Sequence, residues 1–187
     1  MASSTKRNTM ERNTSLWACK RIYVMSWDRF ESLVSQISRA MSSSGFSPDM
    51  IVGIARGGLV PAVRLMHELS LLEFGIIHIR RNTGPGCFSA RVSPKLCWEQ
   101  VPTETSRSIL LVDDIAGTGD TLNTALASLA PSPSTQIRTA TLVLNRHANF
   151  HPDYYGLLID DWVLFPWESR DAAETEAKSR NIPIVEL

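Results

Sequence analysis

The chain has 187 residues with 19 basic and 19 acidic side chains, so its formal net charge is zero. This length suits one domain with a sizeable core, and the neutral charge argues against nucleic acid as a partner. The three cysteines, Cys19, Cys87 and Cys97, lack the spacing of a disulfide framework or a zinc site. No apolar run has the length of a membrane span or a signal peptide. These features predict a soluble cytoplasmic protein without membrane association.

Strand and helix patterns alternate along most of the chain. Residues 1–18 are polar and lack a hydrophobic period, which predicts a flexible tail. A short strand is predicted over residues 21–25, and Ser26 is the predicted N-cap of a helix whose apolar residues continue to Met41 at helical spacing. Further strands are predicted at residues 51–55, 74–79, 109–112 and 140–144, with helices near residues 61–69 and 122–129. This alternation predicts an α/β fold with a parallel sheet flanked by helices.

A long polar stretch between Arg80 and Ser108 interrupts this alternation. It is too long for an ordinary connection in a compact domain, so a functional loop is predicted. Its basic side chains are candidates to bind an anion, although a solvated surface position is an equal alternative for each one. These candidates are Arg80, Arg81, Arg91 and Lys95.

The most informative segment reads ILLVDDIAGTGDT, from Ile109 to Thr121. Its four apolar residues predict a buried parallel strand. Asp113 and Asp114 follow at the carboxyl end of that strand, where open α/β sheets bind their ligands. A loop of small or hydroxylated residues then leads into a helix, and its backbone N–H groups favour phosphate. The residues of this predicted phosphate loop are Ala116, Gly117, Thr118, Gly119, Asp120 and Thr121.

Two carboxylates beside a phosphate loop suit a phosphorylated ribose. The ribose hydroxyls would donate to Asp113 and Asp114, while the 5-phosphate would lie in the loop. A buried strand followed by an acidic turn and a helix cap is the alternative, and receiver domains also carry paired acids.

A second segment, IVGIARGG, combines a buried strand with Arg56, Gly57 and Gly58. The glycines allow the backbone to fold around an anion, and Arg56 supplies a positive charge. A glycine turn with a surface arginine is the simpler reading of this segment alone. The two segments in this order are more specific than either alone.

Together these segments resemble the motifs of the type I phosphoribosyltransferases, which join 5-phosphoribosyl diphosphate to a nucleobase. The match is closest to their xanthine-guanine branch. The C-terminal segment DDWVLFPWE, from Asp160 to Glu168, resembles the hood of that branch. The resemblance implies one phosphoribosyltransferase domain over residues 19–187, with a small hood over about residues 146–187. It also implies Mg²⁺ as cofactor and a homo-oligomer, dimer or tetramer.

The resemblance assigns roles to individual residues. Asp113 and Asp114 would hold the ribose diol, with Asp114 holding the metal through water. Arg56 and the loop of Gly57 and Gly58 would bind the diphosphate leaving group, which the basic candidates between Arg80 and Lys95 would reach. Trp162 would stack on the base, at about 1–3 kcal/mol for such contacts, and Val163 would offer backbone groups. The remaining aromatic side chains of this region, Tyr154, Tyr155 and Trp167, are expected to pack the protein.

Two positions depart from the family pattern. Gly117 stands where the 6-oxopurine enzymes carry a proton-handling aspartate, and Asn145 stands where they carry a base-binding lysine. Arg146 could replace the lost charge and His147 the lost proton acceptor. Three functions remain open: a purine-type phosphoribosyltransferase, a phosphoribosyltransferase of specialised metabolism that acts on a non-standard heterocycle, and a non-catalytic regulator that binds nucleotide or diphosphoribose.

Overall fold

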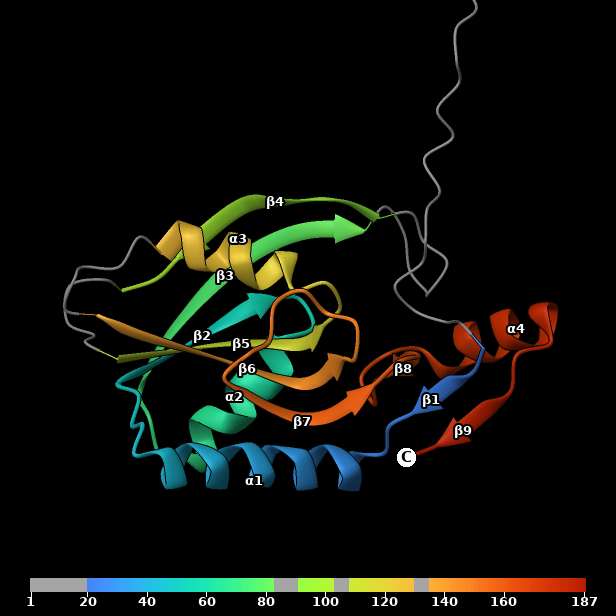
Figure 1. Cartoon of the computed structure of the whole chain (residues 1–187), viewed down its shortest axis with the longest axis horizontal. Coiled ribbons are helices and arrows are strands. Elements are labelled where there is room, and N and C mark those ends of the chain that lie inside the picture. Colours follow the sequence, from blue (N-terminus) through green and yellow to red (C-terminus); the bar gives the residue numbers. More distant parts are fainter. Residues whose placement is uncertain (1–19, 83–90, 103–107, 130–134) are drawn as a thin grey trace, which may run out of the picture.

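The computed structural model describes residues 20–82, 91–102, 108–129 and 135–187, so the predicted tail over residues 1–18 lies outside the described part. The described residues form a large sheet, a small sheet and helices that cover the large sheet on both faces (Figure 1). In chain order the elements are β1 (Ile22–Val24), α1 (Trp27–Ser44), β2 (Met50–Ala55), α2 (Leu59–Glu68), β3 (Glu73–Asn82), β4 (Arg91–Gln100), β5 (Ser108–Ala116), α3 (Asp120–Leu129), β6 (Gln136–Asn145), β7 (Tyr154–Ile159), β8 (Trp162–Leu164), α4 (Arg170–Arg180) and β9 (Ile184–Glu186).

The large sheet has six strands in the order β4-β3-β2-β5-β6-β7. All neighbours are parallel except β3 and β4. Every residue of β2 is buried, as are Ile109–Ala116 apart from Asp114 and Ile115, because helices cover both faces of the sheet centre. The predicted α/β fold with a parallel sheet is confirmed.

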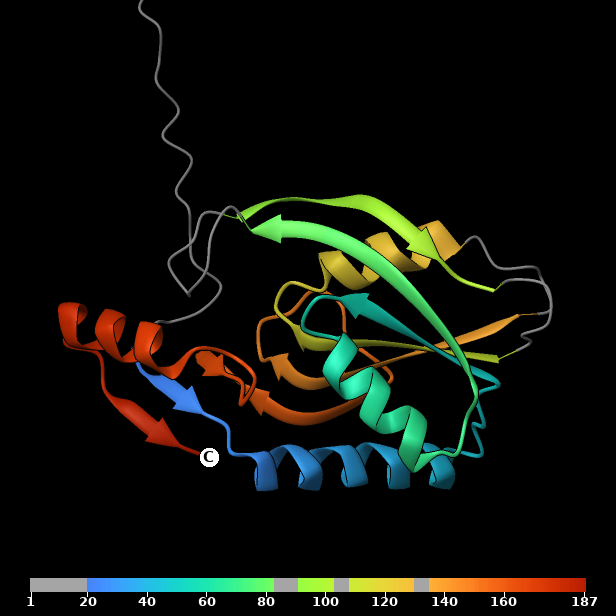
Figure 2. The same ribbon diagram turned by 180° about the vertical axis from the view of Figure 1, so that it is seen from behind.

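The helices divide the core into two layers (Figures 1 and 2). Helices α1 and α2 pack on one face of the sheet, against Leu110 and Val112 of β5. Helix α3 packs on the opposite face, against Leu111. Successive strand residues point to opposite faces, so one apolar run supplies both layers.

Strand β4 corrects the prediction of a long irregular loop between Arg80 and Ser108. Ten of these residues, Arg91–Gln100, form a strand that pairs antiparallel with β3. Pro94 and several charged side chains obscured it in the sequence. An edge strand tolerates both, because one side of its backbone needs no partner.

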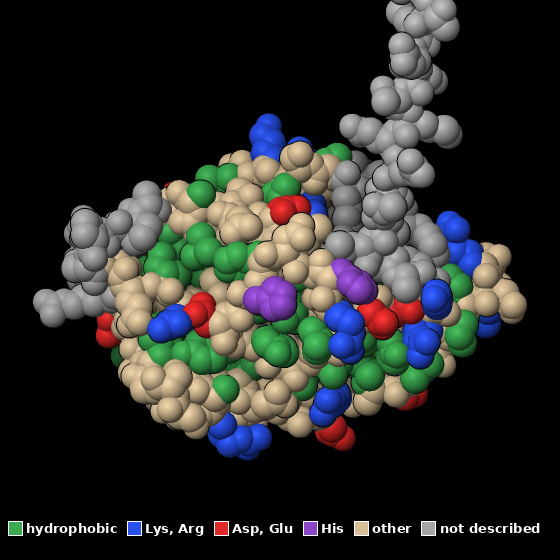
Figure 3. Space-filling view, viewed as in Figure 1, with side chains coloured by type: hydrophobic (Ala, Val, Ile, Leu, Met, Phe, Trp, Pro, Cys, Tyr) green, Lys and Arg blue, Asp and Glu red, His purple; other side chains and the backbone are tan. Residues whose placement is uncertain are grey.

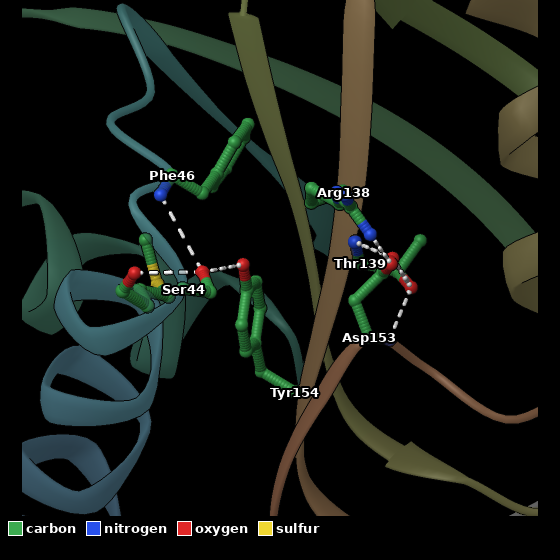
Figure 4. A network of polar contacts seen from close by, with 7 residues as sticks. Ser44, Phe46, Arg138, Thr139, Asp153 and Tyr154 are labelled. Carbon is green, nitrogen blue, oxygen red and sulfur yellow. Dashed lines mark hydrogen bonds and ion pairs between the residues drawn. The ribbon is translucent and has the colours of Figure 1, made fainter.

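Polar contacts fasten α1 and β6 to β7 (Figure 4). The Ser44 hydroxyl donates to the carbonyl of Met41 at 2.7 Å and lies 2.7 Å from the hydroxyl of Tyr154, which is therefore the donor to Ser44. The carboxylate of Asp153 accepts hydrogen bonds from the backbone and hydroxyl of Thr139 at 2.8 and 2.9 Å. Tyr154 is thus a packing residue as predicted. Its neighbour Tyr155 points to the other side and is 42% exposed, so the packing expected of it stays a prediction.

The small sheet draws its strands from both ends of the described chain, in the order β8-β1-β9 with all pairs parallel. Asp161 is buried and holds this sheet together. Its carboxylate accepts hydrogen bonds from the backbone N–H groups of Lys20 at 3.1 Å, Arg21 at 3.0 Å and Trp162 at 3.0 Å. Strand β1 therefore belongs with the C-terminal segment in space. We call β1, β8, β9 and α4 the hood, a set that differs from the predicted range of about residues 146–187 because it adds β1 and leaves out β7.

Candidate active site

The carboxyl ends of the parallel strands point toward the hood (Figure 1). Three segments meet there: the end of β5 with the loop that follows it, the turn between β2 and α2, and the turn between β8 and α4. This is the edge at which open α/β sheets bind ligands. The sequence placed its candidate residues at this edge.

Asp113 and Asp114 lie within the last residues of β5. Asp113 is 8% exposed, and its Oδ1 accepts a hydrogen bond from the backbone N–H of Asp114 at 3.0 Å. Burial, and then the charge of Asp114, raises the pKa of Asp113 well above its usual range. Burial, and then the charge of Glu168, raises the pKa of Asp114 to about 7. Hydrogen-bond donors or a cation at this pair would favour the charged carboxylates.

The turn after β2 runs directly against these two aspartates. A Cβ atom at Gly57 would overlap the carboxylate of Asp114. A Cβ atom at Gly58 would lie 2.7 Å from the carbonyl oxygen of Val112 and 2.8 Å from the Cα of Asp113. The position of Gly58 therefore requires glycine, because the backbone atoms it meets cannot give way, whereas a side chain at Gly57 would force the Asp114 carboxylate to move. The peptide bond between Ala55 and Arg56 is cis, and the Arg56 side chain is exposed at this edge.

The predicted phosphate loop leads into α3, which begins at Asp120. Gly119 has φ 89°, a left-handed conformation that favours glycine, and Phe150 fills the space beside it. The carbonyl of Thr118 accepts hydrogen bonds from the backbone N–H groups of Asn149 at 3.1 Å and Phe150 at 3.3 Å. The segment after β6 therefore holds the loop in place. The first turn of α3 carries backbone N–H groups without partners inside the helix, which favour an anion, and the N–H of Asp120 donates to the Thr118 hydroxyl at 3.2 Å.

Glu168 is a site residue whose role the sequence did not indicate. Its Oε2 accepts a hydrogen bond from the backbone N–H of Phe165 at 2.9 Å, and its own N–H donates to the carbonyl of Phe165 at 3.0 Å. This tight turn brings the carboxyl group near Asp114, whose pKa it raises. Burial raises the pKa of Glu168 itself, and the positive charge of Arg56 in turn acts to lower it. The only sequence signal was its place in the segment that resembles the hood.

Aromatic packing supports the Glu168 turn. Trp167 stacks on Phe165 with ring centroids 4.8 Å apart and planes at 7°. It also meets the edge of Phe30 in α1 at 5.6 Å. The predicted packing role of Trp167 is therefore confirmed, and its neighbour Glu168 faces the site.

The residues predicted for the base lie on two segments. Trp162 is partly buried on β8, and Val163 is buried beside it on the edge strand of the small sheet. Asn145 ends β6 as a buried residue, and its Oδ1 accepts a hydrogen bond from the backbone N–H of His147 at 2.7 Å. Asn145 thus shapes the turn after β6. Arg146 and His147 are exposed on this turn.

The basic candidates of the β3–β4 region differ in placement. Arg81 points toward the phosphate loop and pairs with Asp120 at 2.8 Å. Arg80 and Lys95 are exposed. The side chain of Arg91 lies outside the described part. Among the three candidates with described side chains, the structure therefore brings Arg81 to the loop.

Charged side chains of both signs are interspersed on the face shown in Figure 3. Across residues 20–82, 91–102, 108–129 and 135–187, no helix has the length and hydropathy that crossing a membrane requires.

The fold and the paired loops at its strand ends define a phosphoribosyltransferase. The family described as the phosphoribosyl transferase domain matches residues 25–174. The chain belongs to this family, and it is a glycosyltransferase by class.

Known relatives agree with this assignment. The bifunctional protein PyrR of Ralstonia nicotianae is 31% identical over 134 residues, which are 68% of this chain and 75% of that protein. A xanthine-guanine phosphoribosyltransferase of Idiomarina loihiensis is 22% identical over 152 residues, which are 81% of this chain and 90% of that protein. A solved purine phosphoribosyltransferase from Pyrococcus horikoshii superposes with a TM-score of 0.66 at 26% identity, covering 79% of this chain and 94% of the other.

Proposed function

We propose that this protein transfers 5-phosphoribose from 5-phosphoribosyl 1-diphosphate to a purine or purine-like base and releases diphosphate. The observation that carries the proposal is the contact between three parts of the site. The glycine turn after β2 lies against Asp113 and Asp114. Strand β5, which carries both aspartates, continues into the loop before α3. One ribose with a phosphate at each end would fit these three anion and diol sites.

Each part has a distinct task in this reaction. The amide groups of the loop from Ala116 to Thr121 bind the 5-phosphate at the start of α3. Asp113 and Asp114 accept hydrogen bonds from the ribose hydroxyls, which orients the anomeric carbon. Arg56 and the backbone of Gly57 and Gly58 stabilise the charge that grows on the departing diphosphate. The bond from the anomeric carbon to diphosphate breaks as a nitrogen of the base forms the new bond.

The residues of the site fit Mg²⁺ as cofactor. Asp114 and Glu168 carry carboxyl groups close enough for one to raise the pKa of the other, so a cation between them would relieve their repulsion. Mg²⁺ usually takes only one or two protein carboxylates, with phosphate and water as its other ligands. This agrees with the finding that no cluster of three potential metal ligands exists among the described residues. Asp114 would hold the ion through water, and the ion would neutralise charge on the leaving diphosphate.

Gly117 and the hood limit which bases are candidates for the acceptor. Trp162 supplies an aromatic face for a planar ring, and Val163 lies on an edge strand with one side of its backbone free of strand partners. Gly117 has no side chain to handle a ring proton, and the carbonyl of Asn145 is used by the turn after β6. Adenine or a non-standard heterocycle therefore becomes a candidate, with Arg146 and His147 exposed near the site to assist.

Diphosphate release in a panel of bases tests the proposal. The protein is mixed with 5-phosphoribosyl diphosphate, Mg²⁺ and one base at a time, including guanine, xanthine, hypoxanthine and adenine. Release that depends on one base supports the transferase and identifies its acceptor. Strong turnover of guanine, xanthine or hypoxanthine would rule out the version that acts only on a non-standard heterocycle.

A non-catalytic regulator is the second candidate, because Gly117 lacks a proton-handling group. It predicts tight binding of a nucleotide or of 5-phosphoribosyl diphosphate, with no diphosphate release across a full panel. Calorimetry on the same samples separates the two functions.

We also propose that the protein works in the cytoplasm and as a homo-oligomer. The resemblance to the family supports a dimer or tetramer. Light scattering coupled to gel filtration gives the mass in solution, and a monomer at micromolar concentration would contradict the proposal.

A further inference from the structure

Arg81 reaches the phosphate loop because of its position on β3. Ile77 and Ile79 point to the face that α3 covers, and residues two apart on a strand share a face. Arg81 continues this row beyond the last apolar residue. The pairing of β3 with β4 shifts register between His78 and Ile79 and again between Arg80 and Asn82, but Ile77 and Ile79 still share the α3 face across the first shift.

The guanidinium of Arg81 is only partly satisfied. Its side chain is 17% exposed, and its Nη2 donates to Oδ2 of Asp120 at 2.8 Å. Its Nε is buried and has no hydrogen-bond partner among the described residues. A buried donor without an acceptor is costly, so this edge of the guanidinium has capacity for a further acceptor.

Asp120 occupies an unfavourable place for phosphate binding. It is the first residue of α3, where a bound phosphate would meet the helix N-terminus. Its Oδ2 also accepts the hydroxyl proton of Thr118 at 2.6 Å, so that hydroxyl donates to Asp120 in this structure. The Asp120 carboxylate therefore repels a bound phosphate and occupies the Thr118 hydroxyl that could otherwise donate to it.

We propose that Arg81 is a binding residue for the 5-phosphate, and that Asp120 competes with the phosphate for its guanidinium and so weakens phosphate binding. The inference rests on the proposed function and extends it to a residue outside the loop. On binding, the phosphate accepts hydrogen bonds from Arg81, whose charge also offsets that of Asp120. Arg81 is thereby assigned to the 5-phosphate, not to the diphosphate.

Calorimetric titration with ribose 5-phosphate tests the inference in four variants of the full chain. Arg81→Gln should weaken binding by about 10- to 100-fold, the usual range for a lost bond between charged groups. Arg81→Lys keeps the charge without the planar fork and should fall between Arg81→Gln and the wild type. Asp120→Asn should tighten binding by about 3- to 10-fold, because one nearby negative charge is removed. Glu68→Gln is the matched control. It removes an equal charge from the pair with Arg64, at the end of α2 remote from the strand ends, and should change nothing.

Inorganic diphosphate as a second ligand separates the two ends of the substrate. Its affinity should be the same in Arg81→Gln as in the wild type. A larger loss for diphosphate than for ribose 5-phosphate would reassign Arg81 to the leaving group and overturn the inference. Unchanged ribose 5-phosphate affinity in both Arg81 variants, or weaker binding by Asp120→Asn, would also overturn it. If the wild type binds neither ligand, the proposed function fails together with this inference.

Discussion

Replacing Asp114 by asparagine should stabilise the metal-free protein above neutral pH while it removes most of the activity. The folded protein raises the pKa of Asp114 from 3.8 to about 7. Between these values the folded state holds a proton that the unfolded state releases, so wild-type stability falls as pH rises. The asparagine side chain carries no charge at any pH, so the Asp114→Asn variant would not show this loss.

The magnitude follows from the two pKa values. A difference of about 3 corresponds to an upper limit of about 4 kcal/mol, at about 1.4 kcal/mol for each tenfold change in proton affinity. Solvent at the open edge of the sheet screens part of this. We therefore expect the stability of Asp114→Asn relative to the wild type to rise by about 2 kcal/mol between pH 5 and pH 8.

Urea unfolding followed by tryptophan fluorescence at pH 5, 6, 7 and 8, with a chelator and constant ionic strength, measures this difference. Asp153→Asn is the control, because the pKa of Asp153 is shifted in the opposite direction. Burial alone would raise the pKa of Asp153, but hydrogen bonds from Arg138 and Thr139 lower it. Its carboxylate therefore stabilises the fold throughout this pH range, and the variant should be less stable by a constant amount. A stability difference for Asp114→Asn that stays flat or falls between pH 5 and pH 8 would refute the reasoning.

Three further predictions concern the packing at the glycine turn, in the small sheet and between α1 and β7. Gly57→Ala should displace the Asp114 carboxylate and lower kcat/KM by about 100-fold with little change in Tm. Gly58→Ala should instead lower Tm by about 4–8 °C, because its Cβ would meet backbone atoms at 2.7 Å. Equal effects of the two variants would contradict this division. Asp161→Ala leaves three backbone N–H groups without their acceptor and should cost about 3 kcal/mol, or about 6–12 °C in Tm by calorimetry. Tyr154→Phe loses the bond to Ser44 but keeps its ring packing, so a loss above about 1.5 kcal/mol in urea unfolding would be too large for this contact.

The centre of the site could be predicted from the sequence because its signals are local. The apolar run of β5, the two aspartates and the loop of small residues lie consecutively in the chain. Each needs only neighbouring residues to be interpreted. The glycine turn after β2 has the same local character.

Features that depend on distant pairing could not be predicted in this way. Strand β4 forms because β3 offers it an edge, and Pro94 hid its pattern. The carboxyl group of Glu168 lies near enough to raise the pKa of Asp114 because the turn at Phe165 brings it back toward the sheet. Arg81 is an intermediate case. The predicted strand ended at Ile79, whereas β3 continues to Asn82, and the two-residue alternation along this longer strand directs Arg81 to the α3 face.

The central position of β1 in the small sheet has a consequence for motion. β1 lies between β8 and β9 and leads directly into α1. Any swing of the hood that admits or releases a base must therefore bend the chain at two hinges, one between β1 and α1 and one between β7 and β8. Such a swing would carry Trp167 past Phe30 and the exposed Trp27 at the start of α1. Tryptophan fluorescence would then report the opening and closing of the hood without an added label.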